Sequence, residues 1–297
     1  MAHFSQGQAD ASGTPPPFGP LVSIVIPYYN QPDFVLAAVL SAKEQTYTRI
    51  EVIVVDDGSL VPAEPLLAGV DGITVLRTEN RGVSAARNLG FANSTGDMLI
   101  FLDGDDVLLP NAVETQIHAL GAQPGAGLSF GSCIFIDADN HEIGKGRLCR
   151  PRPDYFITLL ECNPIACPGA AMIRRTAFVA AGRFDEQFRL CEDYQLYLRI
   201  ARYQPLVRHE ECVVKYRKHE NNISRDQAKM FVTTMAVLDE MVPLLTKSER
   251  RRLPHARRRW AHQMHRKSSL VYRVRTLYFA MRAMANVPFT AWFLRTK

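Results

Sequence analysis

Two stretches of sequence decide the fold of this chain: Ile53-Val54-Val55-Asp56-Asp57-Gly58-Ser59 and Met98-Leu99-Ile100-Phe101-Leu102-Asp103-Gly104-Asp105-Asp106. In each of them an uninterrupted apolar run ends in a cluster of aspartates. Such a run is typical of a strand that is buried on both faces of a mostly parallel sheet. Open α/β sheets bind their ligands beyond the carboxyl ends of the strands, so we expect both acidic clusters to lie at one ligand-binding edge.

The second cluster indicates a cation site. Asp103 and Asp105 are two residues apart, so their side chains point to the same side of an extended segment. Carboxylates that point the same way repel each other unless a positive charge lies between them. Mg²⁺ and Mn²⁺ prefer such oxygen ligands and commonly hold phosphates as well. An acidic turn in solvent is the simpler alternative for one cluster, but two clusters in one sheet favour the metal.

The apolar periodicity alternates between strands and helices along most of the chain. We expect strands over residues 21–27, 50–55, 73–76, 97–102, 127–136 and 170–173. We expect helices over residues 33–45, 84–92, 111–120, 175–181 and 193–203, and from residue 228 onward. Pro27 is expected to end the first strand, because proline cannot donate to a ladder. The alternation predicts an α/β fold with helices on both faces of the sheet.

Composition favours an ordinary globular protein. The chain has 297 residues, 47% of them hydrophobic and 22% charged, which is enough for one large domain with an appendage. Its six cysteines form no Cys-x-x-Cys pair, so we expect reduced thiols in a cytoplasmic protein. Residues 1–20 are small, polar and rich in proline and lack the pattern of a signal peptide, so we expect a disordered lead-in.

Charge is unevenly distributed along the chain. Residues 247–297 contain 14 Lys and Arg against one acid, whereas the remainder carries a net charge of −8. Bulky apolar residues, Trp260 among them, are interleaved with this charge, but no uncharged stretch reaches the roughly 20 residues that span a membrane. We expect residues 226–297 to form a basic helical region that lies on an anionic membrane surface, peripherally on the cytoplasmic face. The alternative is that the apolar residues pack on the body of the protein.

Three segments in this order resemble a known family: Val22–Asn30, Val54–Ser59 and Leu102–Asp106. They are similar to the inverting GT-A glycosyltransferases of family 2, and the resemblance covers about residues 21–225. It implies a Rossmann-like GT-A catalytic domain over residues 21–225, with a mostly parallel central sheet. It also implies a metal-dependent enzyme that moves a sugar from a nucleotide-diphosphate donor, preferably a UDP-sugar, to an acceptor hydroxyl. The acceptor would be a cell-envelope, lipid-linked or polysaccharide glycan.

The resemblance also implies which residues hold the nucleotide. Pro27 and Tyr29 would flank the base, and Asp56 or Asp57 would accept a hydrogen bond from its ring N–H, with Asp56 slightly favoured. One of the two aspartates is equally suited to cap the following turn. Arg87 would pair with Asp57 or reach the base or the phosphates of the donor.

The metal site would use Asp105 as a direct ligand of Mn²⁺ or Mg²⁺ and Asp103 as a partner of the ribose hydroxyls, or of the metal through water. Asp106 would lie behind them or cap a helix. In the segment Tyr216–Ser224, His219 would complete the metal site, or Arg217 and His219 would hold the diphosphate.

The acceptor side would be formed by two further segments. Cys191-Glu192-Asp193 begins an expected helix, where Asp193 would act as the general base and Glu192 would position the acceptor. N-terminal capping of the helix is the competing role for Asp193. The segment around Gly169 would form the floor of the acceptor site.

Three rival functions are weaker. A dinucleotide-binding fold would need a glycine fingerprint, which Pro27-Tyr28-Tyr29-Asn30 does not supply. A nucleotidyltransferase also uses acids and a metal, but it usually needs a glycine-rich, basic phosphate loop that the sequence lacks. A nucleic-acid-binding protein would use Arg250–Arg252 and Arg257–Arg259, but the acidic body would repel nucleic acid, so we expect no such partner.

Overall fold

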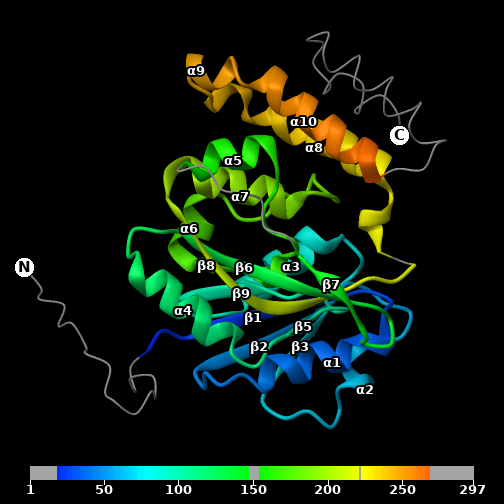
Figure 1. Ribbon diagram of the computed structural model, residues 1–297. Coiled ribbons are helices and arrows are strands. Elements are labelled where there is room, and N and C mark those ends of the chain that lie inside the picture. The colour runs from blue at the N-terminus through cyan, green and yellow to red at the C-terminus, as the bar shows by residue number, and fades with distance from the viewer. Residues whose placement is uncertain (1–18, 147–153, 221, 268–297) are drawn as a thin grey trace, which may run out of the picture.

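The computed structural model describes residues 19–146, 154–220 and 222–267, and a nine-stranded sheet lies at its centre (Figure 1). The strands are β1 (Val22–Tyr28), β2 (Ile50–Asp56), β3 (Thr74–Arg77), β4 (Met98–Phe101), β5 (Val107–Leu108), β6 (Leu128–Ile136), β7 (Glu142–Lys145), β8 (Ala171–Arg174) and β9 (Leu206–Arg217). Their order is β3-β2-β1-β4-β8-β6-β9-β5, and β7 pairs with β6 outside this path.

Most of the strands run in the same direction, as predicted. The strands β3, β2, β1 and β4 are parallel neighbours, and β6 and β9 form a second parallel pair. The strand β8 is antiparallel to both β4 and β6, and it joins the two parallel blocks. Because β8 reverses the direction twice, both blocks point their carboxyl ends to the same side of the sheet.

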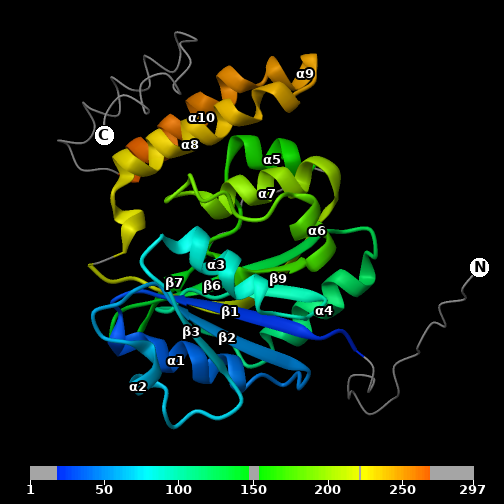
Figure 2. The same ribbon diagram turned by 180° about the vertical axis from the view of Figure 1, so that it is seen from behind.

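Helices cover both faces of the sheet. They are α1 (Pro32–Lys43), α2 (Ala63–Leu66), α3 (Val83–Ala92), α4 (Ala112–Ala122), α5 (Tyr155–Glu161), α6 (Arg175–Ala180), α7 (Glu192–Tyr203), α8 (Gln227–Met241), α9 (Lys247–Arg250) and α10 (Leu253–Lys267). Short 3₁₀ turns are η1 (Pro168–Ala170), η2 (Ile223–Arg225) and η3 (Val242–Leu244). Figures 1 and 2 show α1 and α2 on one side of β1–β3 and α3 on the other.

The core forms where α3 meets the parallel block. Val25 and Val55 are buried in β1 and β2, and Gly90 of α3 lies directly over them. A Cβ atom at Gly90 would overlap the Val25 side chain and would lie 3.2 Å from Cγ2 of Val55. Gly90 therefore permits close packing of α3 against β1 and β2.

One predicted strand end is wrong. The strand β1 continues through Pro27 to Tyr28, and Pro27 pairs in register with Val55 of β2. The peptide groups of Val25 face β4, since Leu102 N donates to Val25 O at 3.0 Å, and those of Pro27 face the same way. The pairing of β1 with β4 ends at Val25, so the missing N–H of proline breaks no ladder bond.

The carboxyl-terminal helices pack on the rest of the protein. The apolar face of α10, formed by Leu253, Ala256 and Trp260, is buried, and α10 contacts both α5 and α8. Trp260 Nε1 donates to Leu160 O at 3.0 Å. The expectation that Trp260 faces a membrane is therefore wrong, since its ring lies inside the protein. Figures 1 and 2 show α8 and α10 side by side above α5 and α7.

The structure tests only part of the terminal predictions. Helix from residue 228 onward is confirmed as far as Lys267, although the division between domains at residue 225 stays a prediction. The proposed lead-in over residues 1–20 lies outside the described residues except for Gly19 and Pro20, and so does the tail beyond residue 267. Among the described helices none is long and apolar enough to cross a membrane.

Candidate active site

The acidic clusters come together beyond the carboxyl ends of β1, β2 and β4. These strands end at Tyr28, Asp56 and Phe101, and the residues that follow form the loops of one edge. This is the edge at which open α/β sheets bind ligands. Pro27 is buried in β1, whereas the side chain of Tyr29 directly after the strand is half exposed.

Asp56 organises the turn between β2 and α2. Its Oδ1 accepts a hydrogen bond from Ser59 N at 2.8 Å, and its Oδ2 accepts one from Ala63 N at 3.0 Å. Arg77 of β3 also donates to Oδ2, at 2.6 Å. The capping role that the sequence left open for one aspartate therefore falls to Asp56.

Asp57 shapes the loop that leads into α3. Its two carboxylate oxygens accept hydrogen bonds from Arg81 N and Gly82 N, each at 2.8 Å. Gly82 has a φ of 96°, which other residues rarely adopt, so this position in the loop favours glycine. Contact of Asp56 or Asp57 with a nucleotide base stays a prediction, and the structure brings both to the same edge.

One prediction paired Arg87 with Asp57, and the structure pairs Arg87 with other carboxylates. Its guanidinium donates to Asp103 Oδ1 and to Glu192 Oε1, each at 2.6 Å, and it lies over the ring of Phe184. The side chain is 2% exposed. The two ion pairs raise the pKa of Arg87 although burial opposes its charge.

Three carboxylates after β4 form the strongest candidate for a metal centre. Asp103, Asp105 and Asp106 each offer an oxygen, and these oxygens lie within 4.8 Å of one another. Burial raises the pKa values of Asp105 and Asp106, and their carboxylate neighbours raise them further. Oxygen ligands in an arrangement with excess negative charge fit Mn²⁺ or Mg²⁺.

The structure brings His219 to this cluster. His219 Nε2 lies 2.8 Å from Asp105 Oδ2, and the amides of Gln31 and Asn222 donate to the same oxygen at 3.3 and 3.4 Å. The proximity that a shared metal site requires is present, and ligation of a metal by His219 stays a prediction. The pattern of the sequence gave no sign of the contributions from Gln31 and Asn222.

Arg217 fixes the aspartate loop instead of facing a diphosphate. Its backbone N–H donates to Asp106 Oδ1 at 2.9 Å, and its Nε donates to Asp105 O at 2.8 Å. The remaining guanidinium nitrogens bond Asp137 O, Ala138 O and Asn140 Oδ1. Arg217 is buried and each of its three guanidinium nitrogens donates within the chain, so this arrangement does not support the alternative in which it holds phosphate.

Asp193 lies at the first turn of α7, as the sequence predicts. Its carboxylate is partly exposed, and Oδ1 accepts a hydrogen bond from Tyr194 N at 2.7 Å. Burial, followed by the charge of Glu192, raises the pKa of Asp193 to about 7. A carboxylate with this pKa is a stronger base than an ordinary aspartate at neutral pH.

Gly169 is buried in η1 beneath the site. A Cβ atom there would lie 3.0 Å from Leu102 Cδ1 and 3.2 Å from Val214 Cγ2. The glycine thus permits close packing between β4, β9 and the segment before β8. Its place on the acceptor side stays a prediction.

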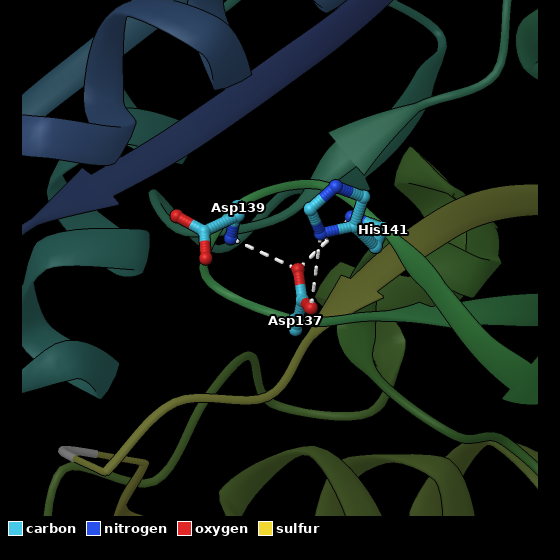
Figure 3. A group of neighbouring side chains, drawn as sticks. All are labelled: Asp137, Asp139 and His141. Atoms are coloured by element: carbon cyan, nitrogen blue, oxygen red, sulfur yellow. Dashed lines mark hydrogen bonds and ion pairs between the residues drawn. The ribbon is translucent and has the colours of Figure 1, made fainter.

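A second acidic group lies in the turn between β6 and β7 (Figure 3). Asp137 Oδ1 accepts hydrogen bonds from the backbone of Asp139 and His141, each at 2.9 Å, and its Oδ2 lies 3.3 Å from His141 Nδ1. The Asp137 side chain thus holds the backbone of Asp139 and both the backbone and the ring of His141 in an exposed turn, and the carbonyl of Asp137 accepts from Arg217. This turn therefore acts as a brace for Arg217.

The chain is similar to a series of known glycosyltransferases. The family model for glycosyl transferase family 2 matches residues 23–180. An uncharacterised glycosyltransferase of Rickettsia typhi is 30% identical over 78% of this chain and 74% of its own length. The chain spans 31 to 65% of the length of four further rickettsial relatives. An Escherichia coli UDP-Glc:α-D-GlcNAc-diphosphoundecaprenol β-1,3-glucosyltransferase is 28% identical over 73% of this chain and 85% of its own length.

Solved structures share the fold. Residues 1–349 of Staphylococcus aureus TarS, in complex with UDP-GlcNAc, superpose with a TM-score of 0.64 at 14% identity, over 89% of this chain and 81% of that chain. The mannosyltransferase PcManGT of Pyrobaculum calidifontis, in complex with GDP-Man and Mn²⁺, gives 0.63 at 18% identity, over 94% of this chain and 79% of its own. These likenesses confirm the predicted GT-A fold. Together with the match over residues 23–180, they show that the chain belongs to glycosyl transferase family 2 and is a glycosyltransferase.

Proposed function

We propose that this glycosyltransferase moves a sugar from a nucleotide-diphosphate donor, a UDP-sugar, to an acceptor hydroxyl with inversion at the anomeric carbon. The observation that carries the proposal is the presence of two kinds of carboxylate at one sheet edge. The group Asp103, Asp105 and Asp106 suits a metal, and Asp193 suits a base. Relatives and fold neighbours whose names include UDP-Glc, UDP-GlcNAc and GDP-Man support a nucleotide-sugar donor.

The proposed chemistry uses Asp193 as the base. Asp193 takes the proton of the acceptor hydroxyl while the oxygen of that hydroxyl bonds to the anomeric carbon. The bond from the anomeric carbon to the diphosphate oxygen breaks on the opposite face, and the nucleoside diphosphate leaves. Mn²⁺ or Mg²⁺ held by Asp105 and His219 would neutralise charge on the diphosphate.

The proposed donor pocket uses the residues before and after the strand ends. Pro27 and Tyr29 flank the base, Asp57 or Asp56 faces its ring N–H, and Asp103 faces the ribose. Both oxygens of Asp56 already accept bonds from the chain, and Arg77 neutralises its charge. Asp57 accepts only from backbone N–H groups, so its charge is less compensated. We therefore favour Asp57 for the base contact.

We further propose a lipid-linked or cell-envelope glycan as acceptor and a peripheral position on the cytoplasmic face of a membrane. The E. coli relative acts, by its name, on a diphosphoundecaprenol-linked sugar. Exposed basic residues on α9 and α10 and in their connection support contact with anionic lipid: Lys247, Arg250, Arg251, Arg252 and Arg258.

A panel of nucleotide-sugars tests the donor and the metal without knowledge of the acceptor. Purified protein is incubated with each donor and Mn²⁺, Mg²⁺ or EDTA, and release of the nucleoside diphosphate is measured. We expect slow, metal-dependent hydrolysis of one UDP-sugar. Equal release with EDTA would contradict the metal, and release only from a donor of another nucleotide would contradict UDP.

A further inference from the structure

Arg87 joins two parts of the site that are distant in sequence. It lies on α3, Asp103 follows β4, and Glu192 begins α7. One guanidinium nitrogen donates to Asp103 and the other to Glu192, each at 2.6 Å. Asp103 is on the proposed donor side, whereas Glu192 is adjacent to the proposed base Asp193. A single buried cation therefore connects the two halves of the site.

The surroundings of Arg87 leave no room for a nucleotide. The side chain is 2% exposed, and Phe184 lies against the face of the guanidinium at 5.1 Å. Both terminal nitrogens are already bound to carboxylates. A phosphate would have to displace one of these carboxylates and leave it in a partly dry site without a counter-charge, which is strongly unfavourable.

We infer that Arg87 is a positioning residue that bridges Asp103 and Glu192 and so orients the base-bearing end of α7, and that it is not a ligand of the donor. This inference rests on the proposed function for the identity of the base. The planar fork of arginine suits the bridge because its nitrogens meet two carboxylates at once. Lysine offers a single point charge and cannot hold both acids in this geometry.

The bridge also sets the charge around Asp193. The groups that act on Asp193 are Glu192 and Asp103, which raise its pKa, and Arg87, which lowers it. Cys191 and Tyr197 of α7 also face Asp193, and burial raises the pKa values of both, which keeps them neutral. Because Arg87 pairs with Glu192, the Glu192 carboxylate stays next to Asp193.

Opposite changes in the titration of Asp193 test the inference. We expect Glu192→Gln to lower the pKa of Asp193, because a neighbouring negative charge is removed. We expect Arg87→Met to raise it, because a positive charge is removed. The pKa is read from the carboxyl carbon of Asp193 by ¹³C NMR, assigned by its absence in Asp193→Asn. A role limited to stability would not move the pKa in two opposite directions.

A matched control separates this effect from the loss of any buried ion pair. Arg202 lies at the other end of α7 and pairs with Glu249 at 2.8 Å, with side-chain exposures of 21% and 13%. Arg202→Met removes a comparable pair from the same helix far from Asp193. We expect a lower melting temperature for this variant and an unchanged titration of Asp193.

Kinetics and binding complete the test. For Arg87→Lys we expect a lower kcat for donor hydrolysis and an unchanged Kd for UDP with Mn²⁺. For Glu192→Gln we expect the same pattern at pH values where Asp193 is fully ionised. A tenfold weaker Kd for Arg87→Lys with an unchanged Asp193 titration, about 1.4 kcal/mol, would make Arg87 a nucleotide ligand and overturn the inference.

Failure of the proposed function is distinguishable from failure of the inference. If the wild-type protein binds and hydrolyses no nucleotide-sugar, the proposed function fails. The NMR titrations still report on Arg87 in that case. If Asp193 titrates identically in wild type, Glu192→Gln and Arg87→Met, the bridge does not act on Asp193 and the inference is wrong.

Discussion

At the scale of single residues, several neighbours hold Asp105 in place. Its Oδ2 faces His219, Gln31 and Asn222, and its backbone carbonyl accepts from Arg217. The carboxylate is therefore oriented before any cation arrives. A metal site needs this preorganisation, because a ligand that is already held in place does not have to be ordered when the metal binds.

We predict that Asp105→Ala abolishes transfer and the metal-dependent part of nucleotide binding, while the fold survives. The carboxylate supplies a ligand and little packing, so its removal should leave the sheet intact. Titration calorimetry of UDP with and without Mn²⁺, and a thermal melt, check this outcome. Unchanged UDP affinity in the presence of Mn²⁺ would sink the assignment of Asp105.

We predict that Asp193→Asn lowers transfer by about 10²- to 10⁴-fold and leaves donor binding intact, because the amide cannot take a proton. Relative to the wild type, the same variant should become more stable as the pH rises. In the wild type the folded state keeps a proton on Asp193 up to about pH 7, so its stability falls between about pH 4 and 7. Melting curves at pH 5 and pH 8 measure the difference. Loss of donor binding would instead make Asp193 structural.

Sequence patterns predicted which residues meet at the site better than they predicted their partners. The strand-end positions of Asp57 and Asp105 follow from the apolar runs before them. The partner of Arg87 does not, because Glu192 lies 105 residues away in sequence and reaches α3 only through tertiary packing. Pairing of a long side chain depends on the final docking of helices, which no local spacing encodes.

At the scale of elements, the contact between α3 and β1 depends on Gly90. We predict that Gly90→Ala destabilises the protein by about 1–3 kcal/mol, because the new methyl group overlaps Val25 and overpacks the core. Chemical denaturation followed by circular dichroism measures the change.

Gly121 provides the matched control. It lies in α4, is exposed, and an added Cβ would meet nothing within 4 Å. Gly121→Ala should stabilise the protein by about 0.5–1 kcal/mol, since alanine loses less backbone entropy in a helix. If the two substitutions changed the free energy of unfolding equally, α3 would shift away from β1 more easily than its packing indicates.

The elements β5, β7, β9, α2 and α5 were missed from the sequence, and β9 and α5 show two different physical reasons. The strand β9 contains the polar run His209-Glu210-Glu211, which interrupts its apolar pattern. The structure places a register shift of the β6–β9 pair there, between Phe130 and Ser132, so the polar residues need no partner on β6. Helix α5 is short, but Asp154 caps it through bonds from Phe156 N and Ile157 N, and that signal was readable.

At the scale of the whole molecule, the positive charge of the carboxyl-terminal region is partly used inside the protein. Arg259 pairs with the buried Glu161 at 2.8 Å, and Arg257 pairs with Asp239. The cations Lys247, Arg250, Arg251, Arg252 and Arg258 of α9, α10 and their connection are exposed. The net charge of the tail therefore overstates the positive charge that can contact a membrane.

We predict that full-length protein co-sediments with anionic vesicles at low salt and not with neutral ones. Charge reversal at Arg251 and Arg258, or truncation after Lys267, should weaken binding without unfolding, because Trp260 and its contacts remain. Reversal at the exposed Lys145 of β7 is the control and should have no effect. Binding that none of these changes alters, or preference for DNA over vesicles, would rule out the membrane proposal.

The place of β9 in the sheet has a consequence for synthesis on the ribosome. The strand β5 follows the aspartate loop directly but pairs only with β9, whose residues are translated about one hundred positions later. Until Arg217 has emerged, the backbone carbonyl of Asp105 and the carboxylate of Asp106 lack the hydrogen bonds that Arg217 donates to them. A nascent chain therefore acquires its proposed nucleotide-facing turn early and its proposed cation-binding loop late. Ribosome-bound chains arrested before residue 206 should lack Mn²⁺ affinity, so the cell makes no active fragment ahead of the finished catalytic body.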